Sequence, residues 1–175
     1  MAYNFVKEPL RAEDADRMSN ACETMQEKLI VWTLLDTGLR VGELCSLTPQ
    51  NMMWQEKALK ISGKGGLYGK MSKKRIVPLS RRLQALLEHY FAINEKWFVK
   101  KRMAQYVVKE VANKARIAVP VTAHVLRHTF ATSALEKGIS LAAVSRILGH
   151  DSLETTAIYL NLTAGHIGDE FHRKW

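Results

Sequence analysis

The chain has 175 residues and a mass of 19.9 kDa, the size of one ordinary domain. Hydrophobic residues make up 47% and charged residues 25%, proportions that exclude extended disorder and collagen-like repeats. Two cysteines are too few for a disulfide framework, and no apolar run is long enough to span a bilayer, so we expect a cytoplasmic protein without membrane contact. The net charge of +9 predicts a polyanionic partner.

The first half of the chain predicts helices followed by a hairpin. A helix with early acidic residues is expected at 9–25, a buried helix ending at Gly38 at 26–36, and a short amphipathic segment at 40–47. Alternating apolar residues at 57–62 and 75–79 predict two antiparallel strands. The connection between them, GKGGLYGKMSKK, is rich in glycine and lysine, so the hairpin should end in a basic tip.

The second half predicts helices at 81–96, 101–116, 123–137, 141–148 and 153–160. Thr122 and Ser140 stand at N-cap positions, and Gly138 and Gly149 at C-cap positions. The predicted fold class is therefore mainly α with a small antiparallel β-sheet (α+β), in one domain without an internal repeat or linker.

The positive charge is concentrated in the middle of the chain. Residues 61–116 carry 14 Lys and Arg against 3 Asp and Glu, whereas residues 1–60 carry 7 against 9 and residues 117–175 carry 5 against 5. A run of charge is often only a solvated face. The alternative is a polyanion-binding surface around the hairpin, formed by Lys70, Lys73, Lys74 and Arg75.

Four separated clusters contain the residues that can support catalysis. They are Arg40 with Glu43 in TGLRVGEL, Lys64 in the hairpin, His124 with Arg127 in HVLRH, and His150 with Tyr159 in LGHDSLETTAIY. Each cluster alone has an ordinary structural interpretation. Together, the order Arg, Lys, His-x-x-Arg, His and Tyr indicates one composite site.

Metal and nucleotide chemistry do not fit these motifs. His124 and His128 are four residues apart but lack the glutamate of HExxH, and no Cys, Asp or Glu cluster completes a coordination shell. The string GKGG lacks the GxxxxGK[ST] frame of a phosphate-binding loop. We therefore expect no metal and no cofactor.

The motifs resemble those of the tyrosine recombinases, the phage integrase family that includes Xer-type chromosome-dimer resolvases. The resemblance extends from about residue 10 to 159, and its most specific stretches are TGLRVGEL, ISGKGG, HVLRHTFATSALEKG and ILGHDSLETTAIY. The 24 residues from Arg40 to Lys64 and the 9 from His150 to Tyr159 are typical of the family. The resemblance implies the tyrosine-recombinase catalytic-domain fold.

Metal-free opening of a phosphodiester requires a nucleophile, charge stabilisation and a proton donor. Tyr159 is the expected nucleophile, and the planar guanidinium groups of Arg40 and Arg127 suit non-bridging phosphate oxygens. The resemblance implies that His150 donates a further bond to the phosphate, that Lys64 protonates the 5′ oxygen and that His124 assists proton transfer.

Supporting roles are assigned to neighbouring residues. Glu43 is expected to orient Arg40 or a nearby histidine, and His128 to be structural. Ten residues separate Lys64 from Arg75, more than is usual in the family, so Lys70, Lys73 and Lys74 are rival candidates for the general acid.

The resemblance also makes the domain organisation an expectation. Residues 1–160 correspond to the catalytic domain, residues 161–175 to a C-terminal tail that packs on its own domain or is exchanged between protomers, and the N-terminal core-binding domain of the family is missing. The chain is then either a fragment or a naturally short form. The expected partner is double-stranded DNA with an inverted-repeat core site. The protein is expected to be a monomer in solution and to form a tetramer on two DNA duplexes. In the cell it is expected to be associated with the nucleoid.

The function predicted from the sequence is site-specific recombination or integration through a covalent 3′-phosphotyrosine, without metal or ATP. Two alternatives remain open at this stage. One is a type IB-like topoisomerase, which uses the same nucleophile without strand exchange. The other is a catalytically silent DNA-binding protein on the same fold.

Overall fold

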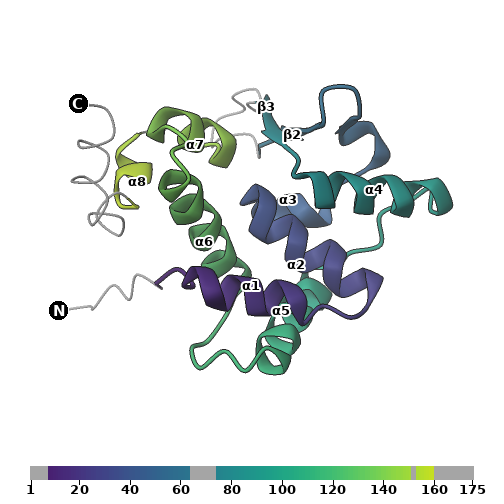
Figure 1. Ribbon diagram of the computed structural model, residues 1–175. Helices are drawn as coiled ribbons and strands as arrows, with labels where there is room; N and C mark the ends of the chain where they lie inside the picture. Colours follow the sequence, from purple (N-terminus) through teal and green to yellow (C-terminus); the bar gives the residue numbers. More distant parts are fainter. Residues whose placement is uncertain (1–7, 64–73, 151–152, 160–175) are drawn as a thin grey trace.

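The computed structural model describes residues 8–63, 74–150 and 153–159 (Figure 1). In chain order its elements are α1 (Ala12–Asn20), α2 (Met25–Thr37), α3 (Val41–Cys45), η1 (Pro49–Asn51), β1 (Met52–Met53), β2 (Ala58–Ser62), β3 (Lys74–Pro78), α4 (Arg81–Ile93), α5 (Lys101–Lys114), α6 (Ala123–Glu136), α7 (Leu141–Leu148) and α8 (Glu154–Ala157). This is the mainly helical α+β fold that the sequence predicts.

Helix α2 is the central helix, and its ends are encoded locally. Thr24 Oγ1 accepts a bond from the Glu27 N–H at 3.1 Å, and Glu27 Oε2 accepts from the Thr24 N–H at 3.0 Å. The helix ends at Gly38, whose φ of 62° lies in the left-handed region. The predicted helix at 9–25 is therefore too long, because Thr24 caps a new helix and α1 ends at Asn20.

The three strands form an antiparallel sheet in the order β1-β2-β3. The hairpin of β2 and β3 confirms the prediction, and its register pairs Ile61 with Arg75 and Ser62 with Lys74 at the end nearest the connection 64–73. Strand β1 was not predicted, because two residues are too short to show an alternating pattern.

Side-chain caps set the starts of the later helices. The hydroxyls of Ser80, Thr122 and Ser140 accept bonds from backbone N–H groups at the starts of α4, α6 and α7. Gly149 follows α7 with a φ of 69°, as its C-cap prediction requires. Gly138 lies one residue beyond the cap of α6, with a φ of 82°.

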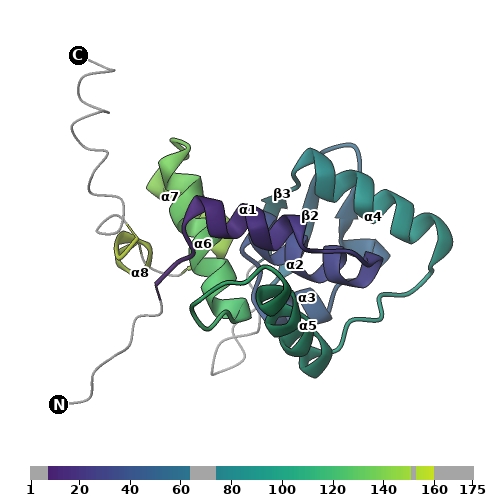
Figure 2. The same cartoon turned by 60° about the horizontal axis from the view of Figure 1, so that its bottom comes forward.

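Two hydrophobic clusters stabilise the fold. The larger surrounds α2 and is built mainly from α1, α2, α4, α5 and the sheet. The smaller consists of Ala131, Ala134, Val144, Leu148 and Tyr159, from the end of α6, α7 and the segment after α8. Figures 1 and 2 place α6, α7 and α8 on one side of the molecule and the sheet with α4 on the other. Among the described residues, no helix is long and apolar enough to cross a membrane.

Candidate active site

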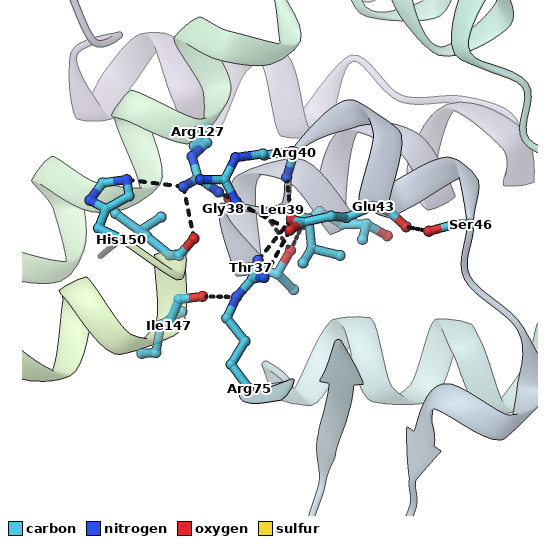
Figure 3. A network of polar contacts seen from close by, with 12 residues as sticks. Thr37, Gly38, Leu39, Arg40, Glu43, Ser46, Arg75, Arg127, Ile147 and His150 are labelled. Atoms are coloured by element: carbon cyan, nitrogen blue, oxygen red, sulfur yellow. Dashed lines mark hydrogen bonds and ion pairs between the residues drawn. The ribbon is translucent and has the colours of Figure 1, made fainter. Parts of the chain in front are cut away.

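Arg127 on α6 lies where the C-terminal ends of two helices meet (Figure 3). Its Nη1 donates to the Gly38 carbonyl at 2.6 Å, just after α2, and its Nη2 donates to the Leu148 carbonyl at 2.8 Å, at the end of α7. Carbonyls at helix C-termini lack intrahelical partners and carry the negative end of the helix dipole. They therefore offset the cost of a guanidinium whose residue is only 4% exposed.

The electrostatic environment of Arg127 is strongly positive. Burial lowers its pKa to about 10, and the nearby charge of Arg40 acts in the same direction. The guanidinium still carries its charge at neutral pH. A buried cation with a second cation beside it is a site that favours an anion.

His150 is held between Arg127 and α8. Arg127 Nη2 lies 3.0 Å from His150 Nε2, and because a guanidinium only donates, Nε2 is the acceptor. The ring proton then lies on Nδ1, which donates to Thr156 Oγ1 at 2.7 Å. Burial lowers the pKa of His150 to about 4, with further lowering by Arg127 and Arg40, so the ring is neutral at pH 7.

Arg40 and Glu43 are joined at the start of α3. Glu43 Oε2 accepts from the backbone N–H of Arg40 at 2.9 Å, and Glu43 Oε1 lies 3.3 Å from Arg40 Nη1. The Arg40 side chain is 49% exposed, so its guanidinium faces solvent beside Arg127 (Figure 3). Burial acts to raise the pKa of Glu43, but bonds from Arg75 and from the Arg40 backbone outweigh it and lower the pKa below its usual value.

Three aromatic rings connect His124 to the expected nucleophile. The rings of His124 and His128 stand edge to face with centroids 4.2 Å apart, and the centroids of His128 and Tyr159 are 5.2 Å apart. His124 is exposed, whereas Tyr159 is only 3% exposed and belongs to the smaller hydrophobic cluster. Burial raises the pKa of the Tyr159 hydroxyl, and the charges of Arg127 and Arg40 oppose that rise.

The structure describes one of the four lysines that the sequence places near the hairpin tip. Lys64, Lys70 and Lys73 lie outside the described residues. Lys74 is exposed at the start of β3, in keeping with a solvated basic face.

The structure gives Arg75 a different environment from the one that the sequence predicts. Its side chain is only 10% exposed, and its guanidinium bonds both carboxylate oxygens of Glu43. The run of basic residues in the sequence therefore divides at the sheet, with Lys74 in solvent and Arg75 inside.

Sequence reasoning missed two groups that hold the site. The Gly38 carbonyl was considered only as a helix end, and Thr156 was not singled out, although its hydroxyl accepts from Nδ1 of His150. Thr156 lies six residues after His150, and only the fold brings the two together.

The arrangement can bind a tetrahedral anion between two arginines, with a histidine and a phenol nearby. Within the ranges that the structure describes, His, Cys, Asp and Glu form no group of three that could hold a metal ion.

Comparison with known proteins finds relatives over most of the chain. A sequence model described as the phage integrase family matches residues 8–166. Tyrosine recombinase XerA of Pyrococcus horikoshii is 30% identical over 178 residues, covering 94% of this chain and 60% of the relative. Tyrosine recombinase XerA of Pyrococcus furiosus is 34% identical over 165 residues, covering 86% of this chain and 55% of the relative. The chain thus spans little more than half the length of these relatives.

Solved structures share the fold. A crystal structure of XerA recombinase superimposes with a TM-score of 0.81 at 31% identity, covering 94% of this chain and 64% of the other. XerH site-specific recombinase, bound to a palindromic difH substrate in a post-cleavage complex, gives a TM-score of 0.73 at 22% identity and covers 93% of this chain and 53% of the other. At that identity, the second likeness concerns the fold alone.

Proposed function

Because the chain belongs to the phage integrase family, we propose that it is the catalytic part of a tyrosine recombinase, which cuts and rejoins DNA at specific sites. The observation that carries the proposal is the meeting of Arg40, Arg127 and His150 from three distant motifs, beside Tyr159. Residues 1–160 form the catalytic domain in this proposal.

The two arginines bind the scissile phosphate. Arg40 presents a half-exposed guanidinium, and Arg127 supplies a charge held by two helix ends. Two cations stabilise the extra negative charge of a pentacoordinate phosphorus without a metal ion. His150 donates a hydrogen bond to the phosphate once the phosphate replaces Arg127 as the partner of its Nε2. The ring stays neutral in this step because its proton moves from Nδ1 to Nε2 and Nδ1 then accepts from the Thr156 hydroxyl.

Tyr159 forms the covalent intermediate. Its Oη attacks phosphorus, the bond to the 5′ oxygen breaks, and the phosphate becomes a 3′-phosphotyrosine. The tyrosine proton passes to His124, and Lys64 gives a proton to the departing 5′ oxygen. The reverse attack by a 5′ hydroxyl rejoins the strand, so no external energy source is needed.

The buried state of Tyr159 keeps the nucleophile inactive without DNA. Burial raises the pKa of its hydroxyl, and a phenol is a weak nucleophile while it retains its proton. For reaction, Tyr159 leaves the smaller hydrophobic cluster and approaches the arginines, whose charges favour the phenolate.

The proposed partner is a DNA duplex with an inverted-repeat core site. The XerH structure was solved with its difH substrate, and the basic residues at 61–116 of the present chain supply charge for phosphate contacts. A tetramer on two duplexes, with residues 161–175 exchanged between protomers, completes the proposal, and Lys70, Lys73 and Lys74 contact the DNA backbone.

The test is covalent capture of DNA. A library of nicked duplexes with randomised inverted-repeat arms is incubated with the chain, and the DNA that remains attached after denaturation is recovered. We expect an adduct that Tyr159→Phe abolishes. Tyr106→Phe is the matched control, because Tyr106 is 63% exposed on α5, and this variant should form the adduct normally.

The captured DNA then separates the related functions. A recombinase exchanges strands between two duplexes that carry the recovered sequence, whereas a topoisomerase only relaxes supercoils. Absence of any adduct across the library contradicts the proposed function and leaves a DNA-binding protein.

A further inference from the structure

Arg75 contacts the elements that hold both halves of the catalytic site. Its Nη1 and Nη2 donate to Glu43 Oε1 and Oε2 at 2.8 and 2.7 Å, and its Nε donates to the Ile147 carbonyl at 2.7 Å (Figure 3). One planar guanidinium thus links β3 to α3 and to the end of α7. A bidentate bond to a carboxylate fixes both the distance and the plane of the two groups.

The first link leads to Arg40. Glu43 accepts from Arg75 through the same two oxygens that accept from the backbone and the guanidinium of Arg40. The Glu43 side chain is only 11% exposed, so few other partners can hold it. Arg75 therefore determines where Glu43 lies, and Glu43 in turn holds the start of α3 and the Arg40 side chain.

The second link leads to His150. Arg75 bonds the carbonyl of Ile147, and Arg127 bonds that of the next residue, Leu148, so two arginines hold the C-terminus of α7. A Cβ atom placed on Gly149 would lie 2.9 Å from Arg75 Cδ and 3.1 Å from its Cζ. The Arg75 side chain therefore packs against the backbone of the residue that precedes His150.

The position of Arg75 in the sheet adds a third link. Arg75 pairs with Ile61 as the second residue of β3 after the connection 64–73, which contains Lys64. Strand β3 is thereby fixed to the Glu43 carboxylate, which also bonds Arg40. It is fixed as well to the C-terminal end of α7, which lies just before His150.

We propose that Arg75 is a positioning residue for strand cleavage, which sets Arg40 through Glu43 and sets His150 through the end of α7. It touches none of the reacting atoms in this scheme. The inference rests on the proposed function for its effect on the reaction. Its effect on the geometry of α7 can be measured without DNA.

The cleavage test uses the full chain and the duplex recovered by covalent capture, in single turnover at saturating DNA. Arg75→Met should lower the rate constant of adduct formation by roughly 10- to 100-fold, with the dissociation constant for DNA changed by less than about threefold. Arg75→Lys should not restore the rate, because an ammonium group cannot make the bidentate bond.

A matched control separates positioning from loss of stability. Arg82 on α4 forms the same type of bidentate pair with Asp36 and bonds Ser19. Arg82→Met should lower the melting temperature and reduce the amplitude of adduct formation through unfolded protein, but leave the rate constant unchanged. If Arg75 only stabilised the fold, Arg75→Met would likewise lower the melting temperature and the amplitude and leave the rate constant unchanged.

A double-mutant cycle tests the route through Glu43. If Arg75 acts partly through this carboxylate, the double variant of Arg75→Met and Glu43→Gln should lose less activity than the product of the two single losses. Multiplicative losses contradict the link to Arg40. An unchanged rate constant in Arg75→Met overturns the proposal.

Hydrogen exchange keeps the inference separate from the proposed function. The amides of Gly149 and His150 both donate to the Ser145 carbonyl, at 2.9 and 3.1 Å. In the free protein, Arg75→Met should speed their exchange by about tenfold or more, and Arg82→Met should not. Unchanged exchange refutes the link to α7 even if adducts form. Failure of wild type to form an adduct refutes the proposed function alone.

Discussion

His128 and His150 lie within the site, and their environments make the charged form unfavourable. Burial lowers the pKa of both rings from 6.5 to about 4, with additional lowering by His124 and Arg127 at His128, and by Arg127 and Arg40 at His150. Burial is thus the main reason that these histidines are neutral, and the positive charge of the site adds to its effect. Acid should therefore act on the free protein through these two residues.

The free energy of unfolding should fall as the pH is lowered from 6.5, the ordinary pKa of histidine, to about 4, the pKa of both rings in the folded protein. From pH 6.5 to 4 the unfolded chain binds more protons than the folded one, so the free energy of unfolding rises with pH there. Each histidine accounts for up to about 3 kcal/mol across the full window. Urea unfolding between pH 7 and 5 measures the slope, which His128→Gln should reduce.

His89 provides the control for this measurement. It is exposed on α4, and His89→Gln should leave the slope as in wild type. A slope that His128→Gln does not change would show that groups outside this site cause the acid sensitivity.

At the scale of elements, Gly38 joins α2 to the helices on the other side of the site. It has a φ of 62°, and a Cβ there would lie 2.4 Å from Phe130 Cδ1 and 2.8 Å from Leu148 Cδ2. The same residue presents its carbonyl to Arg127. Close packing of the chain at this point brings the end of α2 to the buried guanidinium.

Alanine substitutions at three glycines should separate backbone strain from steric contact. Gly138→Ala should cost about 1 kcal/mol, because its φ is 82° but the space around it is open. Gly38→Ala adds the clash with Phe130 and Leu148 and should cost about 2–4 kcal/mol. Gly42→Ala, in α3 with open space, should be neutral or stabilising by up to about 1 kcal/mol.

Chemical denaturation of the three variants measures these differences. Equal costs for Gly38→Ala and Gly138→Ala would mean that Phe130 and Leu148 move aside freely. Such a result would contradict tight packing between α2 and the α6–α7 pair.

At the scale of the whole molecule, the charge distribution determines how DNA affinity depends on salt. Residues 61–116 carry 14 basic and 3 acidic residues, and this range includes β3, α4 and α5. Each phosphate contact contributes about −0.9 to the slope of log affinity against log salt. We expect a slope steeper than about −3, measured by fluorescence anisotropy with a short duplex. A slope near zero would contradict a DNA-binding role for the basic segment.

The elements of this protein were predictable where local chemistry defines them. Thr122 and Ser140 mark helix starts through their own hydroxyls, and α7 has the predicted bounds 141–148. The division between α1 and α2 was missed although Thr24 and Glu27 form a capping box. The predicted helix was extended from its early acidic residues past Thr24, because the two reciprocal bonds that make Thr24 the cap of a new helix are seen only in the structure.

The site was predictable as a set of residue types in order, but its internal bonds were not. Arg75 stood in a basic run and was assigned to DNA, because its partners Glu43 and Ile147 are 32 and 72 residues away along the chain. The tautomer of His150 follows from its contact with Arg127, and the charge of Arg127 is stabilised by two helix ends. Such dependencies arise only from tertiary packing.

The placement of the site across two hydrophobic clusters has a consequence for heat resistance. Arg40 and Glu43 belong to elements packed on the larger cluster, whereas Leu148 and Tyr159 are part of the smaller one. A small cluster can open in a partial unfolding event of lower free energy than the global transition. We therefore expect thermal inactivation of cleavage to begin several degrees below the melting temperature, and to reverse on cooling, because the opened part includes the nucleophile but not the larger cluster around α2.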